Sequence, residues 1–135
     1  MKLQGGCLCG AMRYEVDGQL SDISHCHCSM CRRFHGAAFS TYAKVEPGKF
    51  RWLKGQELLV VYETSPGIGW GFCRVCGSSL GMPTDGTLGS VALGTLDTDP
   101  GARPSYHMFT GSKAAWYEIT DALPQFDAWP PKEMT

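Results

Sequence analysis

The chain has 135 residues, 43% of them hydrophobic, and its 12 Lys and Arg against 13 Asp and Glu give a formal net charge of −1. This length fits one domain spanning residues 1–135, and the apolar fraction excludes an intrinsically disordered chain. Proteins that track nucleic-acid phosphates are clearly basic, and a membrane helix needs roughly 20 apolar residues, so we expect no nucleic-acid partner and no membrane partner.

Short extended segments separated by turn residues predict a mainly β fold with at most short helical turns. Ser29 is the predicted N-cap of a short helix over 30–35, and Gly36 is its predicted end. The segment 113–119 fits a helical turn and a strand equally, and three late prolines predict an irregular tail. The expected extended segments, in chain order, are 12–16, 23–28, 38–45, 50–53, 58–62, 70–76, 79–82, 88–95 and 105–110.

Seven cysteines fall in three tight clusters: Cys7-Leu-Cys9, Cys26-His-Cys28-Ser-Met-Cys31 and Cys73-Arg-Val-Cys76. An odd number of cysteines fits a disulfide framework badly. No apolar run follows Lys2, so we expect no signal peptide and a reducing, cytoplasmic location. Closely spaced thiols in such a compartment indicate metal ligands or redox groups.

The outer two clusters share a glycine directly after their second cysteine, Gly10 and Gly77. Glycine tolerates the backbone angles of a turn that folds amide N–H groups around sulfur. Together, Cys7, Cys9, Cys73 and Cys76 form a predicted closed tetrahedral zinc site, which is the usual structural type. Two buried cysteine pairs or redox dithiols are the alternative. Zinc binding energy on the order of 10 kcal/mol would rival the net stability of a small domain.

The central cluster offers three ligands that can converge without help from a distant segment. Strand alternation directs Cys26 and Cys28 to one face, and Cys31 follows within one helical turn. Three thiolates leave a tetrahedral zinc one position open, which is typical of a catalytic site. His27 as a fourth ligand is the alternative, although strand alternation turns it to the other face.

Two arginines, Arg32 and Arg33, follow the last cysteine of the central cluster directly. They could offset thiolate charge or bind a substrate carboxylate, and the alternative is a solvated helix face. The other histidines, His25, His35 and His107, are expected to be ordinary hydrogen-bonded or exposed residues, with a site role left open for His107. The cysteine pattern as a whole predicts two Zn²⁺ per chain.

With these motifs, the chain resembles the glutathione-dependent formaldehyde-activating enzyme (GFA) family, which includes the CENP-V proteins. The matching stretches are 6–10, 25–33 and 72–77, followed by Tyr106-His107, Ser112-Lys113 through Trp116, and Asp121-Ala-Leu-Pro124. The resemblance implies an Mss4-like, zinc-stabilised β-sheet fold. It also implies structural zinc at the outer four cysteines and catalytic zinc at the central three.

The activity that this resemblance implies is a carbon–sulfur lyase joining glutathione and formaldehyde into S-hydroxymethylglutathione, with a small-molecule thiol and aldehyde as partners. The glutathione-using members are longer than this chain, so no residue that contacts glutathione is carried over. A non-catalytic, zinc-stabilised protein-interaction domain with the same fold is the alternative function. Thiol redox chemistry at Cys26, Cys28 and Cys31 is a third.

Overall fold

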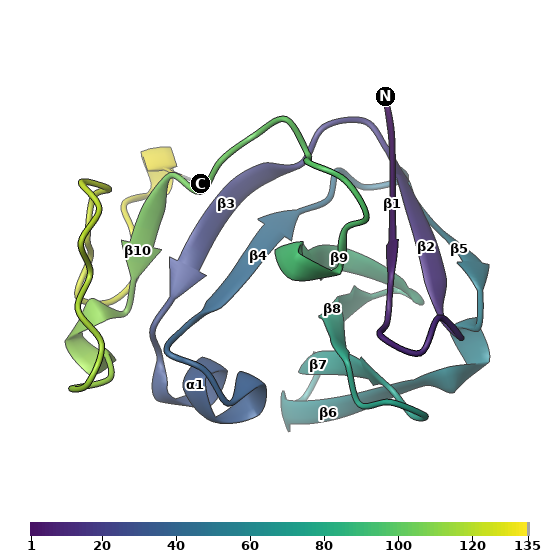
Figure 1. Ribbon diagram of the computed structural model, residues 1–135, viewed down its shortest axis with the longest axis horizontal. Helices are drawn as coiled ribbons and strands as arrows, with labels where there is room; N and C mark the ends of the chain where they lie inside the picture. Colours follow the sequence, from purple (N-terminus) through teal and green to yellow (C-terminus); the bar gives the residue numbers. More distant parts are fainter. Residues whose placement is uncertain (135) are drawn as a thin grey trace. The chain divides into compact units, whose positions relative to one another are not determined.

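The computed structural model describes residues 1–134 and is mainly β, as the sequence predicts (Figure 1). The chain divides into two compact units, one formed by residues 1–21 and 43–102, the other by residues 22–42 and the chain from residue 103 onward. Among the described residues, the longest helix, α1 (Ser29–His35), has only 7 residues, and no helix has the length and apolar character needed to cross a membrane.

The first unit contains an antiparallel three-stranded sheet in the order β1-β2-β5. Its strands are β1 (Lys2–Gly6), β2 (Arg13–Asp17) and β5 (Phe50–Lys54). Alternate residues of this sheet form a core in which the rings of Tyr14 and Phe50 stack with centroids 5.3 Å apart. Burial raises the pKa of Tyr14 to about 12, and its hydroxyl shares a 2.7 Å hydrogen bond with Thr95.

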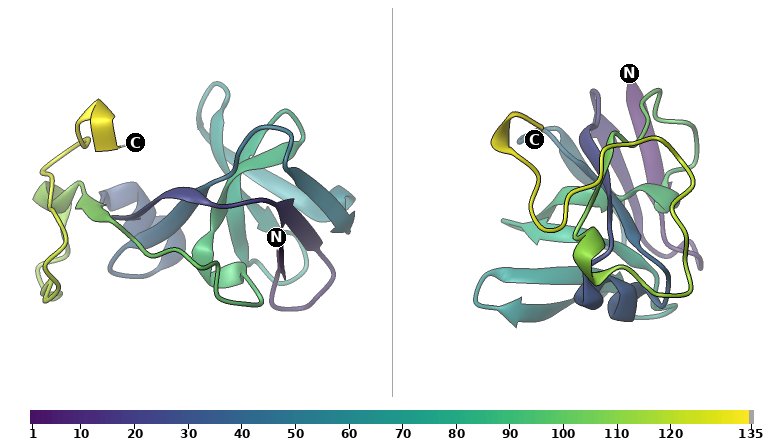
Figure 2. Two further views of the ribbon diagram at one scale, coloured as in Figure 1. Left: turned by 90° about the horizontal axis from the view of Figure 1, so that it is seen from above. Right: turned by 90° about the vertical axis from the view of Figure 1, so that its left-hand side faces the viewer.

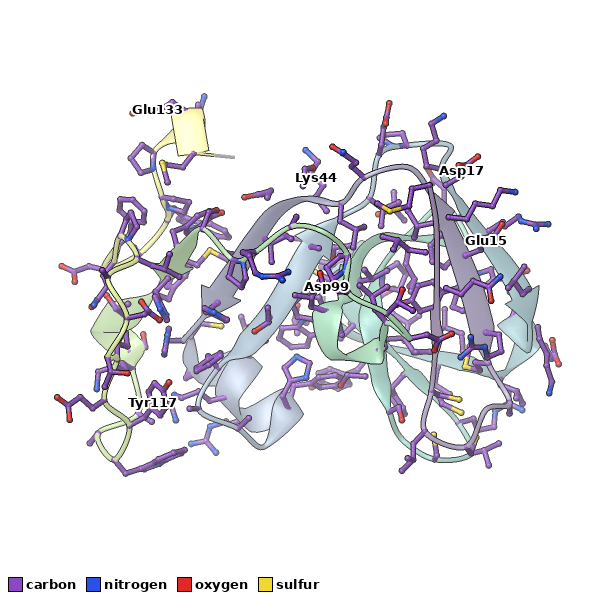
Figure 3. All side chains as sticks on the ribbon, turned by 45° about the horizontal axis from the view of Figure 1, so that its top comes forward. Glu15, Asp17, Lys44, Asp99, Tyr117 and Glu133 are labelled. Carbon is purple, nitrogen blue, oxygen red and sulfur yellow. The ribbon has the colours of Figure 1, made fainter. Side chains whose placement is uncertain are left out.

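The one buried carboxylate on β2 is fully paired. Glu15 (labelled in Figure 3) accepts hydrogen bonds from Gln4 and Arg51, both at 3.0 Å. These two donors lower the pKa of Glu15, so the ionised form is favoured.

The rest of the first unit is an antiparallel meander in the order β9-β8-β7-β6. Its strands are β6 (Leu59–Ser65), β7 (Ile68–Cys73), β8 (Ser79–Thr84) and β9 (Thr87–Ala92), with 3₁₀ turns at Gln56–Leu58 and Leu93–Thr95. The expected strand over 88–95 was therefore too long, because a 3₁₀ turn replaces its last three residues.

The second unit contains β10 (Tyr106–Met108), β3 (Ser21–Cys26) from its second residue onward, and the first three residues of β4 (Ser40–Lys44). Strand β10 runs parallel to β3, with Met108 opposite Cys26. Helix α1 follows β3 and ends at Gly36, whose φ of 60° is left-handed, as the sequence predicts for the stop. The expected strand over 105–110 is limited to β10, and a 3₁₀ turn occupies Thr110–Ser112.

The C-terminal segment of the second unit has little regular structure (Figure 2). Residues 113–119, which the sequence left undecided, form neither a helix nor a strand. The predicted irregular tail is confirmed, apart from a short 3₁₀ turn at Lys132–Met134.

Strand β1 was not predicted, because its Gly5-Gly6 end has low strand propensity. The structure explains the glycine, since a Cβ at Gly5 would lie 2.5 Å from the carbonyl oxygen of Thr95 and 2.6 Å from the hydroxyl oxygen of Tyr14. Close packing of neighbouring segments therefore requires glycine where local propensity disfavours a strand.

A similar close approach predicts a large effect of Gly81→Ala in β8. A Cβ there would lie 2.0 Å from the carbonyl oxygen of Ser90 on β9, so the two strands must separate. We expect a loss of about 3 kcal/mol in the free energy of unfolding, measured by chemical denaturation in zinc-containing buffer. Gly94→Ala is the matched control, because no atom lies within 4 Å of its added Cβ; it should change stability by less than about 0.5 kcal/mol. Equal effects of the two substitutions would contradict the packing argument.

Candidate metal centres

Four cysteines of the first unit converge as the sequence predicts. The sulfur atoms of Cys7, Cys9, Cys73 and Cys76 all lie within 4.8 Å of one another. The first pair lies in the turn between β1 and β2. Cys73 is the last residue of β7, and Cys76 lies in the turn that follows. This group, called here the tetrad, could hold a metal ion.

Two loops of similar construction carry the tetrad. In each loop the backbone amide of the first cysteine donates a hydrogen bond to the carbonyl oxygen five residues later. The distances are 3.2 Å from Cys7 to Met12 and 3.0 Å from Cys73 to Ser78. The glycine after each second cysteine has the same left-handed φ of 78°. This backbone angle is strained for other residues, which accounts for the repeated glycine.

Backbone amides point at sulfur in both loops. The Met12 amide donates to Cys7 Sγ at 3.3 Å, and the Val75 amide donates to Cys73 Sγ at 3.4 Å. Such bonds stabilise thiolates, the form in which cysteine binds metal. Both turns thus direct backbone N–H groups at sulfur, as the sequence predicts.

Ser78 links the two loops, and the sequence analysis missed it. Its hydroxyl oxygen accepts a 3.0 Å hydrogen bond from the Leu8 amide and lies 3.2 Å from Cys76 Sγ. Because that oxygen already accepts, its proton is free to be donated to sulfur. The pKa of Cys76 falls to about 5, chiefly because of this side-chain hydrogen bond. The serine directly after the Cys-x-x-Cys-Gly motif was the available signal.

Three cysteines of the second unit form the other group, called here the triad. The sulfur atoms of Cys26, Cys28 and Cys31 also lie within 4.8 Å of one another. Cys28, and not the predicted Ser29, is the N-cap of α1, because its sulfur accepts a 3.2 Å hydrogen bond from the Cys31 amide. The capping bond holds the second sulfur of the triad at the start of the helix that supplies the third.

The thiols of the triad differ in pKa because their sulfur atoms lie close together. The pKa of Cys31 falls to about 6, chiefly because the Cys26 thiol donates a hydrogen bond to its thiolate. The same interaction, followed by burial, raises the pKa of Cys26. The buried hydroxyl of Ser40 also favours the Cys31 thiolate, although its geometry falls short of a hydrogen bond. Without a cation, therefore, negative charge concentrates on Cys31.

The two arginines after the triad lie in different environments. Arg32 is half-buried, and its Nε donates a 3.1 Å hydrogen bond to the carbonyl oxygen of Ser112. Arg33 is exposed. Their role in substrate binding stays a prediction.

The hydrogen bond of the His27 ring is made to His107 and not to the triad. Its Nε2 lies 2.8 Å from Nδ1 of His107, and Nε2 of His107 lies 3.0 and 3.1 Å from the two carboxylate oxygens of Asp121. Both histidines are buried, with 0% and 1% of their surface exposed. Burial, followed by the nearby charges of His107 and His25, lowers the pKa of His27 to about 4, so its ring is neutral at pH 7.

The Asp121–His107–His27 chain was not predicted, because Asp121 and His107 are distant in sequence from the triad. The hydrogen bond from His107 lowers the pKa of Asp121, so this acceptor is ionised at neutral pH. Nε2 of His107 must then carry a proton. The ring of His25 lies 4.8 Å from that of His107, and its Nδ1 bonds Thr41 Oγ1 at 2.7 Å.

We predict one tautomer for each ring of this chain. Nδ1 of His27 is buried without a hydrogen-bond partner, and a bare lone pair there costs less than an unpaired N–H. His27 then donates from Nε2 to Nδ1 of His107. Long-range proton–nitrogen NMR should find only Nε2 protonated on both rings, and Asp121→Ala should abolish this uniform pattern. A protonated Nδ1 on His27 would contradict the assignment.

Comparison with known proteins finds matches that each cover at least 75% of the chain. A protein of Halomonas elongata, provisionally named a glutathione-dependent formaldehyde-activating enzyme, is 29% identical over 129 residues, covering 88% of this chain and 82% of its own length. The crystal structure of a Rhodobacter sphaeroides protein matches with a TM-score of 0.54 and 28% identity, covering 75% of this chain and 97% of that one. The model of the glutathione-dependent formaldehyde-activating enzyme family matches residues 2–112. The chain therefore belongs to the GFA family.

Proposed function

We propose that the protein is a zinc-dependent carbon–sulfur lyase that joins a glutathione-like thiol to a formaldehyde-like aldehyde and catalyses the reverse reaction. The observation that carries the proposal is the difference between the two cysteine groups, four sulfurs in the tetrad against three in the triad. Four ligands complete a tetrahedral metal, and three leave a position for a substrate. Family membership and the name of the Halomonas relative support the same chemistry.

The donor sets fit Zn²⁺, because soft thiolates bind it well and the sulfurs of each group are already close together. We assign a structural zinc to the tetrad and a catalytic zinc to Cys26, Cys28 and Cys31. At the triad, bound zinc would supply a Lewis acid with room for a thiolate or an oxygen. All seven cysteines are free of disulfides, as such sites require, and we propose a reducing, cytoplasmic location for the same reason.

The proposed reaction adds a thiol to a carbonyl group, and two arginine side chains are proposed to bind the thiol substrate. The sulfur of the thiol bonds to the aldehyde carbon, the carbonyl π pair moves to oxygen, and that oxygen gains a proton for the one that the thiol lost. Arg32 and Arg33 are proposed to hold a carboxylate of the thiol substrate. A guanidinium carries five N–H donors, so Arg32 retains donors beyond the one bonded to Ser112.

Metal analysis tests the division of the cysteines. We expect two zinc ions per wild-type chain and one in Cys31→Ser, which should stay folded by circular dichroism. Cys76→Ser is the matched control: it should also lose one zinc but unfold at a clearly lower temperature, because the tetrad is the structural site. One zinc in both the wild type and Cys31→Ser would refute the division. A Cys31→Ser variant that loses stability as Cys76→Ser does would favour a non-catalytic interaction domain.

Exchange NMR tests the reaction. Formaldehyde and glutathione form their adduct spontaneously, so the measured quantity is the exchange rate with and without protein. We expect the wild type to accelerate exchange and Cys31→Ser to return it to the spontaneous rate. If the wild type gives no acceleration, the glutathione and formaldehyde assignment is wrong.

A further inference from the structure

Helix α1 and strand β4 of the second unit bring two further side chains close to the triad. Cys31 and His35 are four residues apart on α1, which places them on one face about 6 Å apart along the axis. Ser40 and Tyr42 are two residues apart on β4, so they share a face about 7 Å apart. The Tyr42–His35 pair therefore lies one helical turn from Cys31 on α1 and one strand repeat from Ser40 on β4.

Side chains of α1 and β4 meet at two places. Ser40 lies beside Cys31, and the Tyr42 hydroxyl lies 2.9 Å from Nε2 of His35. The rings of His35 and Tyr42 also pack with centroids 5.5 Å apart. His35 thus contacts both the ring and the hydroxyl group of Tyr42.

The Tyr42 hydroxyl and the His35 ring are both uncharged at neutral pH. Burial raises the pKa of Tyr42. The hydroxyl is therefore protonated at neutral pH. Burial lowers the pKa of His35, so its ring is neutral there. A neutral His35 with its proton on Nε2 donates to the Tyr42 oxygen and leaves the tyrosine O–H available to another acceptor.

We propose that Tyr42 is a catalytic residue whose hydroxyl donates a hydrogen bond to the oxygen of a sulfur–carbon–oxygen adduct at the triad, and that His35 is its positioning residue. The inference rests on the proposed metal at Cys26, Cys28 and Cys31. When the carbon–sulfur bond forms, the carbonyl π pair moves onto oxygen, and a hydrogen bond from the Tyr42 O–H would stabilise the negative charge that develops there. The proton that the oxygen finally keeps balances the one released by the thiol.

The proposal adds a selective donor to a site otherwise made of sulfur. A metal held by three thiolates would bind any thiol. A hydroxyl donor favours a ligand whose sulfur and oxygen are bonded to the same carbon. A hydrogen bond to a charged oxygen changes affinity by about 10- to 100-fold. This preference exists whether or not formaldehyde and glutathione are the physiological substrates.

The test is ligand binding to cobalt-substituted protein, followed by its visible absorption spectrum. Thioacetate carries sulfur and oxygen on one carbon, and ethanethiol lacks the oxygen. We expect Tyr42→Phe to weaken thioacetate binding at least 10-fold and to change ethanethiol binding less than 2-fold. Tyr62→Phe, at an exposed position of β6, is the matched control and should change neither.

His35 is tested by two substitutions in the same assay. His35→Gln keeps a donor for the Tyr42 oxygen and should retain most of the thioacetate preference, whereas His35→Leu should lose it. Zinc-loaded forms of every variant should hold two zinc ions per chain, so that lost binding is not lost metal. In formaldehyde–glutathione exchange, Tyr42→Phe should lower kcat at least 10-fold with little change in KM.

Each outcome decides between the two proposals. Equal weakening of thioacetate and ethanethiol binding in Tyr42→Phe overturns the inference, and so does the absence of any spectral change when either ligand is added to the wild type. A thioacetate preference that depends on Tyr42, together with no accelerated formaldehyde exchange, leaves the inference standing and overturns the proposed reaction.

Discussion

Electrostatic repulsion between closely packed sulfur atoms is the constraint on which both candidate metal centres depend. Thiolates within 4.8 Å of one another repel, so a group of them cannot ionise fully unless a cation lies among them. Without a cation the conflict is visible in the triad, where the pKa of Cys31 falls while that of Cys26 rises. The left-handed glycines and the amide-to-sulfur bonds of the tetrad loops meet the same need, because they place partial positive charge against sulfur.

The two cysteine groups are supported by different means. The tetrad joins loops about 60 residues apart in sequence, and Ser78 ties one loop to the other. The triad is local in sequence, and its support comes from a helix N-cap at Cys28 and from residues of β4. A closed group that links distant segments suits a structural role, and a local group with polar neighbours suits chemistry.

Cysteine spacing and glycine placement were enough to predict both cysteine groups, and short extended segments between turn residues predicted the mainly β fold. These signals are local, because they depend on turn geometry within a few residues. The expected extended segment over 23–28 was too long, because β3 ends at Cys26 and Cys28 caps α1. The supporting residues could not be predicted, because they are distant from one another along the chain. Asp121 lies 14 residues from its partner His107, and His107 lies 80 residues from His27. Strand β1 was missed for a similar reason, since packing against Thr95 and Tyr14 favours glycine there and local propensity does not.

The parallel pairing of β10 with β3 has a consequence for the order of synthesis. Residues at the triad leave the ribosome about 80 residues before His107, which lies beside them in the folded unit. During that interval the three thiols lack β10 and the Asp121–His107–His27 chain, so they are exposed to oxidants and to free metal alike. Early capture of a metal ion would protect the nascent chain from mispaired disulfides, so the yield of folded protein would depend on the metal supply during translation.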